Sequence, residues 1–285
     1  MGIVLGANQY GKAETRLVHV ARAGEPHTLT DLNVSVALAG DLADVHLSGD
    51  NGHVLPTDTQ KNTVYAFARQ HGVASVEAFG LLLARHFVDS QEPIHAARVR
   101  LESYSWSRLG PHSFQRDGGE VRTATVTYDG STATVVSGVT DLVLLNSTDS
   151  EFVGFIEDGY TTLAPTTDRI LATAVTARWR HATADGDWDG SYAAVRSLLV
   201  EAFVGTYSRS LQQTLYAMGE RVLTARPEVV EVRLAMPNRH HFLVDLSPFG
   251  LDNPNEVYFA ADRPYGLIEG TVARDDAPAA GLAWW

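Results

Sequence analysis

Apolar and polar residues alternate along this 285-residue chain in a pattern that predicts the same series of elements twice. Period-two alternation is typical of a half-buried strand, whereas apolar residues three and four positions apart indicate an amphipathic helix. In the first half these patterns predict two strands, two helices and two further strands, at residues 15–22, 32–38, 59–70, 75–87, 94–106 and 121–128. Ser75 is a suitable N-cap for the second helix, and Asp129-Gly130 is a strong hairpin turn signal.

The second half repeats this order of elements. The strands are predicted at 134–145, 169–180, 229–236 and 241–246, and the helices at 191–203 and 210–223. Two ββααββ units in tandem predict an α+β fold of two antiparallel sheets, each with a helix pair on one face. We divide the chain into a first unit at 1–132 and a second at 133–285. Because an open antiparallel sheet leaves unpaired edges, closure across subunits predicts a homo-oligomer.

Composition narrows the classes of function. The net charge of -12 argues against a nucleic-acid partner, because phosphate binding relies on clustered Lys and Arg. The absence of cysteine excludes disulfides, thiolate zinc sites and iron–sulfur clusters together. The chain shows neither a signal-peptide pattern nor an apolar run of about 18 residues, so we expect a cytoplasmic protein with no membrane span.

Common cofactor motifs are also absent from the sequence. It contains no Gly-x-Gly-x-x-Gly after a strand, no Gly-x-x-x-x-Gly-Lys-Ser/Thr, no His-Glu-x-x-His and no Gly-x-Ser-x-Gly. A metal site assembled from residues distant in the sequence stays open.

The remaining candidates for a functional site are individual residues that could bind a flat, anionic heterocycle. Arg169 offers a planar fork of two parallel donors, Gln212 can donate and accept, and Phe152 offers a stacking face. Each has a simpler interpretation. Arg169 could pair with the neighbouring Asp168, Phe152 could belong to the core, and Gln212 could be solvated.

Asn238 and His240 lie two residues apart between two apolar stretches. In an extended backbone such residues point to the same face, so an amide and an imidazole would converge, whereas His241 would point to the other face. A core histidine is the simpler interpretation of His240.

Six segments along the chain together resemble the urate oxidase (uricase) family. They are Tyr-Gly-Lys at 10–12, Thr-Asp-Thr-Gln-Lys-Asn-Thr-Val-Tyr at 57–65, Phe-Val-Gly-Phe at 152–155, Thr-Asp-Arg-Ile-Leu at 167–171, Leu-Gln-Gln-Thr-Leu-Tyr at 211–216 and Met-Pro-Asn-Arg-His-His-Phe-Leu-Val-Asp-Leu at 236–246. The resemblance implies tandem tunnelling-fold (T-fold) units and a homotetramer with sites at subunit interfaces. It also implies oxidation of urate by dioxygen to 5-hydroxyisourate and hydrogen peroxide without a cofactor.

The resemblance further implies roles for individual residues. The substrate-binding positions would be Thr57, Asp58, Phe152, Leu163, Arg169, Leu211, Gln212 and Asn238. Lys12, Thr57 and His240 would form a proton relay, and Thr57, contributed by a neighbouring subunit, would bind dioxygen or water together with Asn238. Leu211 stands where the family pattern has Val, a change of little consequence if its backbone N–H makes the contact.

Other interpretations stay open. Lys12 could be a surface lysine after a turn, and Thr57 could be a helix cap. The protein could be a non-catalytic purine-binding or structural T-fold ring, although binding alone would not require Lys12, Thr57 and His240 together. It could also be a zinc-dependent pterin-handling T-fold enzyme, for which we find no set of ligands.

Overall fold

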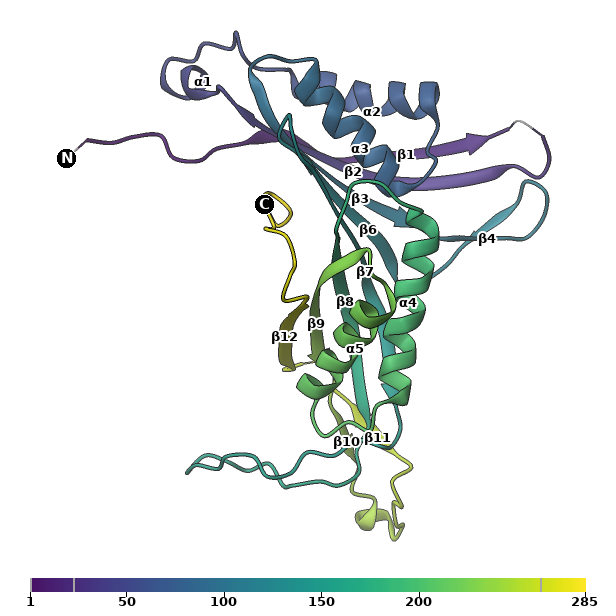
Figure 1. Cartoon of the computed structure of the whole chain (residues 1–285). Helices are drawn as coiled ribbons and strands as arrows, with labels where there is room; N and C mark the ends of the chain where they lie inside the picture. Colours follow the sequence, from purple (N-terminus) through teal and green to yellow (C-terminus); the bar gives the residue numbers. More distant parts are fainter. Residues whose placement is uncertain (1, 23, 262) are drawn as a thin grey trace. The chain divides into compact units, whose positions relative to one another are not determined.

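The computed structural model describes residues 2–22, 24–261 and 263–285 and forms two compact units (Figure 1). Unit 1 comprises Met1–Gly138, Trp179–Tyr192 and Asp276–Trp285, and unit 2 comprises Val139–Arg178 and Ala193–Asp275. The chain passes between the units within β7, β8 and α4, so the division after residue 132 stays a prediction. None of the helices in the described part is long and apolar enough to cross a membrane.

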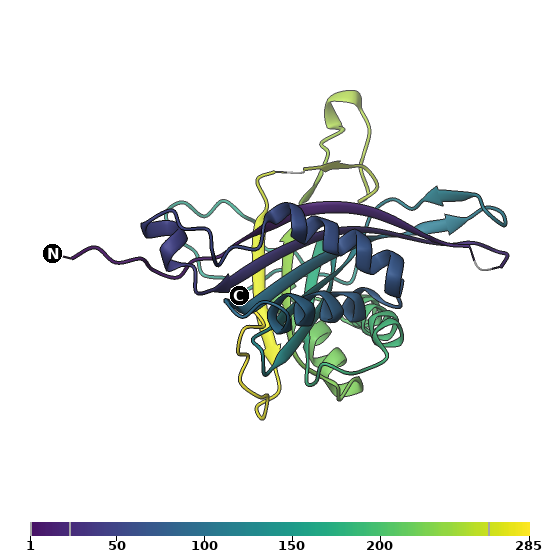
Figure 2. The ribbon, with the colours of Figure 1, turned by 90° about the horizontal axis from the view of Figure 1, so that it is seen from above.

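Unit 1 is an antiparallel sheet with two helices on one face (Figure 2). The strand order is β1-β2-β3-β6, with a small β4–β5 hairpin beside it. Its elements are β1 (Tyr10–Ala21), β2 (Thr28–Gly40), α1 (Ala43–Leu47), α2 (Thr57–His71), α3 (Val76–Asp89), β3 (Ile94–Tyr104), β4 (Trp106–Arg108), β5 (Phe114–Arg116) and β6 (Val121–Tyr128).

The predicted patterns explain how this unit packs. Val34, Val36 and Leu38 share one face of β2 and are all buried under the helices. Ser75 is the N-cap of α3, since its side chain accepts a hydrogen bond from the Ala78 N–H. The core of unit 1 therefore lies between α2, α3 and the inward face of the sheet.

Unit 2 repeats the arrangement with strand order β7-β8-β9-β12 and with α5 packed on β9 and β12. Gly219 of α5 permits this close packing, because an added Cβ would lie 2.6 Å from a Val272 methyl group. The remaining elements are β7 (Ala133–Asn146), β8 (Leu171–His181), α4 (Trp188–Gly205), α5 (Leu211–Ala225), β9 (Val229–Asn238), β10 (His241–Leu243), η1 (Ser247–Phe249), β11 (Tyr258–Ala260) and β12 (Gly266–Ala273).

One predicted strand is wrong. We expected residues 241–246 to form the last strand of the second sheet, but β10 pairs with β11 in a separate two-stranded sheet. The fourth strand is β12, which runs antiparallel to β9. The chain leaves the sheet after Asn238, where the Arg239 N–H donates to the Ala172 carbonyl at 2.8 Å. Glycines at both Gly266 and Gly270 weaken the apolar pattern of β12 in the sequence.

Candidate functional site

Lys12 faces the helix-bearing side of the unit 1 sheet. It lies opposite Val36, and Thr15 lies opposite Val34, so three steps along β1 match two along β2. This β-bulge keeps Lys12 and Thr15 on one face although they are three residues apart. Glu14, within the bulge, has a φ of 57° and donates its N–H to Ser35 Oγ. Lys12 is half-buried and lies within β1 rather than after a turn.

Gly11 allows β1 to approach β2 closely beside Lys12. A Cβ added at Gly11 would lie 1.8 Å from the Val36 carbonyl oxygen, which is backbone and cannot turn aside. The Tyr-Gly-Lys segment therefore needs its glycine for strand pairing.

Thr57 is the first residue of α2 and does not act as its cap. Pro56 occupies the N-cap position without a side-chain bond, and the half-buried Thr57 hydroxyl has no hydrogen-bond partner in the described part of the chain. The adjacent, exposed Asp58 binds Lys61 and Asn62. The hydrogen bond from Lys61 is the largest influence that lowers the pKa of Asp58, and the positive charge of Lys12 contributes in the same direction.

The Tyr10 hydroxyl connects β1 with the loop that precedes α2. It donates to the Leu55 carbonyl at 3.1 Å and accepts from the Leu55 N–H at 2.8 Å. The fully buried Gln60 also donates to the Leu55 carbonyl, at 3.3 Å, while its Oε1 has no partner among the described residues. Burial raises the pKa of Tyr10 above its usual value. Lys12 and Thr57 therefore lie close to a shared hydrogen-bonded connection.

In unit 2, Arg169 is held over the ring of Phe152. The guanidinium carbon lies 5.2 Å from the ring centroid, and Phe152 stacks on Phe155 at 5.0 Å. The Arg169 Nε donates to Ser150 Oγ at 3.2 Å, and its backbone N–H donates to the Ser150 carbonyl at 2.9 Å. Burial lowers the pKa of Arg169.

The simpler interpretations of Arg169 and Phe152 do not hold. Within residues 2–22, 24–261 and 263–285, no carboxylate pairs with Arg169 and its two terminal nitrogens donate to no protein group. Asp168 instead accepts a hydrogen bond from Thr148. Phe152 is half-buried and stacks on another ring at the base of a loop. The guanidinium fork therefore stays available beside an aromatic face.

Buried hydroxyl groups connect this segment to the start of α5. Ser150 forms a parallel bridge with Ser208, whose hydroxyl accepts a hydrogen bond from Thr214. All three side chains are fully buried. Ser210 then caps α5 by accepting from the Gln213 N–H. We call Phe152, Arg169, Leu211 and Gln212 the clamp, and its two members at the start of α5 are thereby fixed relative to Ser150.

Leu211, Gln212 and Leu163 differ in their exposure to solvent. Leu211 is buried as the first residue of α5, so its backbone N–H lies in the turn where helix amides lack partners within the helix. Gln212 is exposed, and Leu163 is 57% exposed in the loop between Phe152 and Thr166, which bridge each other.

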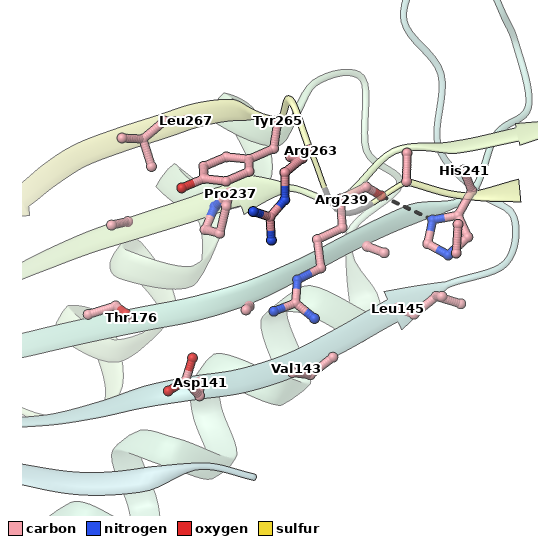
Figure 3. Close-up of a pocket in the computed structure, with 15 residues that line it drawn as sticks. Asp141, Val143, Leu145, Thr176, Pro237, Arg239, His241, Arg263, Tyr265 and Leu267 are labelled. Carbon is pink, nitrogen blue, oxygen red and sulfur yellow. Dashed lines mark hydrogen bonds between the residues drawn. The ribbon is translucent and has the colours of Figure 1, made fainter.

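A cavity lies beside the segment that carries Asn238 and His240, but neither of these two residues is among the described residues that line it. Pro237, Arg239 and His241 line this cavity of about 730 Å³ on the β7–β8–β9 surface (Figure 3). Because β9 ends at Asn238, strand alternation does not extend to His240, and the convergence of Asn238 and His240 on one side stays a prediction. His240 is half-buried and stacks on Phe242 at 5.8 Å, and its ring forms no hydrogen bond in the described part of the structure.

The predicted residues therefore form two groups. Unit 1 contains Lys12, Thr57 and Asp58, and unit 2 contains Phe152, Leu163, Arg169, Leu211, Gln212, Asn238 and His240. The sequence patterns did not predict Ser150, Ser208 or Tyr10 as supporting residues. Only their closeness in the sequence to predicted site residues could have indicated this supporting role, and serines and tyrosines are common in such positions. The described residues contain no cluster of three or more His, Asp or Glu side chains that could hold a metal ion.

Comparison with known proteins decides the family. A family model described as Uricase matches residues 8–127 and 135–269. The chain belongs to the uricase family. It is 52% identical over 284 residues to a uricase of Arthrobacter globiformis, covering 99% of this chain and 94% of that relative. A uricase of Dictyostelium discoideum is 37% identical over 277 residues, covering 94% of this chain and 96% of the relative.

The fold of this chain also matches solved structures of the uricase family. The crystal structure of uricase from Arthrobacter globiformis matches with a TM-score of 0.97 at 52% identity, covering 100% of this chain and 99% of that chain. This match confirms the predicted α+β class with tandem T-fold units.

Proposed function

We propose that this chain catalyses the oxidation of urate by dioxygen to 5-hydroxyisourate and hydrogen peroxide, using neither a metal nor an organic cofactor. Membership of the uricase family supports the reaction. The observation that carries the assignment to residues is Arg169, held beside the Phe152 ring while its terminal nitrogens stay unpaired in the described part of the chain.

The unit 2 residues would bind the substrate. The Arg169 fork donates two parallel hydrogen bonds to neighbouring acceptors on the urate anion, and Phe152 stacks on the ring. Gln212 reads the adjacent ring edge with its amide, and the Leu211 N–H donates from the start of α5. Leu163 and Asp58 complete the surroundings of the ring, while Asn238 lies over it.

The unit 1 residues would supply proton transfer. Lys12, acting as the base, accepts a proton through the Thr57 hydroxyl, which completes the urate dianion, and His240 passes protons onward. The dianion then transfers electrons to dioxygen held by Asn238 and Thr57, giving a hydroperoxide at C5. Departure of hydrogen peroxide and addition of water at C5 give 5-hydroxyisourate. The sum is urate, dioxygen and water converted to 5-hydroxyisourate and hydrogen peroxide.

A homotetramer would bring the two groups together across subunit interfaces, with Lys12, Thr57 and Asp58 of one subunit meeting the clamp of its neighbour. The unpaired outer edge of β1 is consistent with such closure. An isolated monomer should therefore be inactive, and full activity after dilution to monomers would contradict the shared site. We expect the enzyme to work in the cytoplasm.

The test is loss of urate absorbance with simultaneous detection of hydrogen peroxide, using dialysed protein in air with and without a strong chelator. Equal loss of urate and gain of peroxide, unchanged by the chelator, is the expected result. No loss of urate would favour a binding-only ring. Loss that the chelator abolishes and added metal restores would favour a metal-dependent enzyme.

A further inference from the structure

The Tyr10 hydroxyl holds both polar backbone groups of one residue. It donates to the Leu55 carbonyl and accepts from the Leu55 N–H, at 3.1 and 2.8 Å. Leu55 belongs to the loop before α2, whereas Tyr10 begins β1, so 45 residues of sequence separate the partners. This pair of bonds fixes the position of the loop relative to the strand.

The two ends of this connection lead directly to the proposed proton-transfer residues. Lys12 follows Tyr10 by two residues on the same face of β1, and Thr57 follows Leu55 by two residues. Pro56 limits the backbone freedom between Leu55 and Thr57, because its ring fixes φ. Movement of Leu55 would therefore move the Thr57 hydroxyl relative to Lys12.

Gln60, from within α2, also holds the Leu55 backbone in place. Its Nε2 donates to the Leu55 carbonyl at 3.3 Å, although the side chain is fully buried and its Oε1 has no partner among the described residues. A buried acceptor without a partner is unfavourable for stability. A buried amide at this position therefore calls for a benefit other than stability, and positioning of the loop provides one.

We propose that Tyr10, assisted by Gln60, is a positioning residue that sets the geometry between Lys12 and Thr57 for proton transfer. The inference rests on the proposed function, because it assigns Tyr10 a role in that reaction. Tyr10 itself touches neither substrate nor dioxygen in this scheme. It should therefore affect turnover and leave urate binding by the Arg169 clamp unchanged.

The first experiment compares Tyr10→Phe with Tyr65→Phe. The control is closely matched, because the Tyr65 hydroxyl also joins α2 to β1, donating to the Arg16 carbonyl at 3.2 Å but away from Lys12. Since misplacement of reacting groups by about 1 Å can cost roughly 100-fold, we expect kcat of Tyr10→Phe to fall about 10- to 100-fold with KM for urate unchanged. Tyr65→Phe should retain the wild-type kcat. Equal losses in both variants would mean general loosening of α2 and would overturn the proposal.

A double-mutant cycle tests whether Tyr10 acts through Thr57. Thr57→Ala removes the hydroxyl that Tyr10 is proposed to position, so adding Tyr10→Phe to Thr57→Ala should lower kcat no further. A full, additive loss in the double variant would show that Tyr10 acts independently of Thr57 and would overturn the proposal.

Gln60→Met provides a second variant should Tyr10→Phe fail to fold or assemble. Methionine retains volume but removes both the donor to Leu55 and the unpartnered acceptor, so the melting temperature should be maintained while kcat falls at constant KM. Loss of stability with unchanged kcat would contradict the proposal.

Failure of the inference and failure of the proposed function have different outcomes. Wild-type protein that does not oxidise urate would refute the function, whereas active wild-type protein with unchanged kcat in folded Tyr10→Phe or Gln60→Met would refute only the positioning role.

Discussion

The two halves of the candidate site hold their polar groups in opposite ways. In unit 2, Arg169 is fixed by its backbone, by Ser150 Oγ and by the Phe152 ring, and only its terminal nitrogens stay available. In unit 1, Lys12 and Thr57 are half-buried, and the fixed point between their segments is the Leu55 backbone held by Tyr10.

This difference matches the two tasks we propose. A binding residue gains from being held still, because less side-chain freedom is lost when the ligand arrives. A proton-transfer pair must instead come within hydrogen-bond reach of the proton that moves, and such bonds often tighten only when the substrate is bound. We therefore expect changes in unit 2 to act mainly on KM and changes in unit 1 to act mainly on kcat.

The largest effect should follow Lys12→Met, which preserves an apolar stem but removes the proposed base. General-base catalysis contributes typically about 10²- to 10⁴-fold, so kcat should fall by roughly that factor while KM for urate changes little. Steady-state kinetics would measure both constants. Arg221→Met is the control, because Arg221 forms an exposed pair with Glu201 and its loss should leave kcat nearly unchanged. A Lys12 variant dominated by a rise in KM would contradict the division of tasks.

Arg169→Lys should give the next largest effect, on the other constant. Lysine retains the charge but loses the planar fork, and one hydrogen bond to a charged group is worth about 1.5–3 kcal/mol. KM for urate should therefore rise about 10- to 100-fold, with a smaller change in kcat. Binding of a non-reacting urate analogue, measured by calorimetry, should weaken by the same factor. An unchanged KM would remove Arg169 from the clamp.

Ser150→Ala should produce a smaller effect in the same direction. It removes the acceptor that holds Arg169 Nε but leaves the guanidinium in place, and a typical hydrogen bond contributes about 1 kcal/mol. We expect KM to rise roughly fivefold at nearly constant kcat. Ser197→Ala, which removes an exposed hydroxyl bonded to Glu201 on α4, is the control and should leave KM unchanged. A fall in kcat alone would argue that Ser150 belongs to the chemical step.

The smallest expected effect concerns stability at high pH. Because burial raises the pKa of Tyr10, the folded state retains this proton after the unfolded chain has released it. The contribution of protonated Tyr10 to the free energy of unfolding is therefore fully present below its pKa in the unfolded chain, about 10. It is lost as the pH rises through the higher pKa that Tyr10 has in the folded protein. Urea unfolding at pH 9 and 11 should show that wild-type protein loses more stability than Tyr10→Phe, by less than about 1 kcal/mol. Equal losses in the two proteins would mean that the pKa of Tyr10 is not raised by burial in the folded state.

Sequence patterns predicted the elements that have strong periodicity or clear end signals. The helices α2, α3 and α5 and the Ser75 cap follow from apolar spacing and from the capping residue. The sequence patterns did not predict β12, because two glycines interrupt its apolar pattern and its pairing with β9 is set by the sheet. Residues 241–246 have a strand-like composition, but the strand that forms there, β10, pairs with β11 in a short separate sheet.

The candidate site was predictable as a set of residue types but not as a set of contacts. The convergence of Asn238 and His240 was expected from strand geometry, but β9 ends at Asn238, so it stays a prediction. The orientation of Lys12 was not predictable, because the bulge relies on Glu14 adopting a positive φ that its residue type does not announce. The support from Ser150, Ser208 and Thr214 also escaped prediction, since buried and solvated hydroxyl residues look alike in a sequence.

The bulge in β1 also determines how this strand can change in length during evolution. It contains one residue more than regular pairing with β2 requires, between Lys12 and Thr15. Deletion of Ala13 would restore regular alternation and leave Lys12 and Thr15 two residues apart on the same face. Deletion of Arg16, within the regularly paired part, would instead turn either Lys12 or Leu17 away from the core. Natural insertions and deletions in this strand should therefore be tolerated at the bulge and selected against on either side of it.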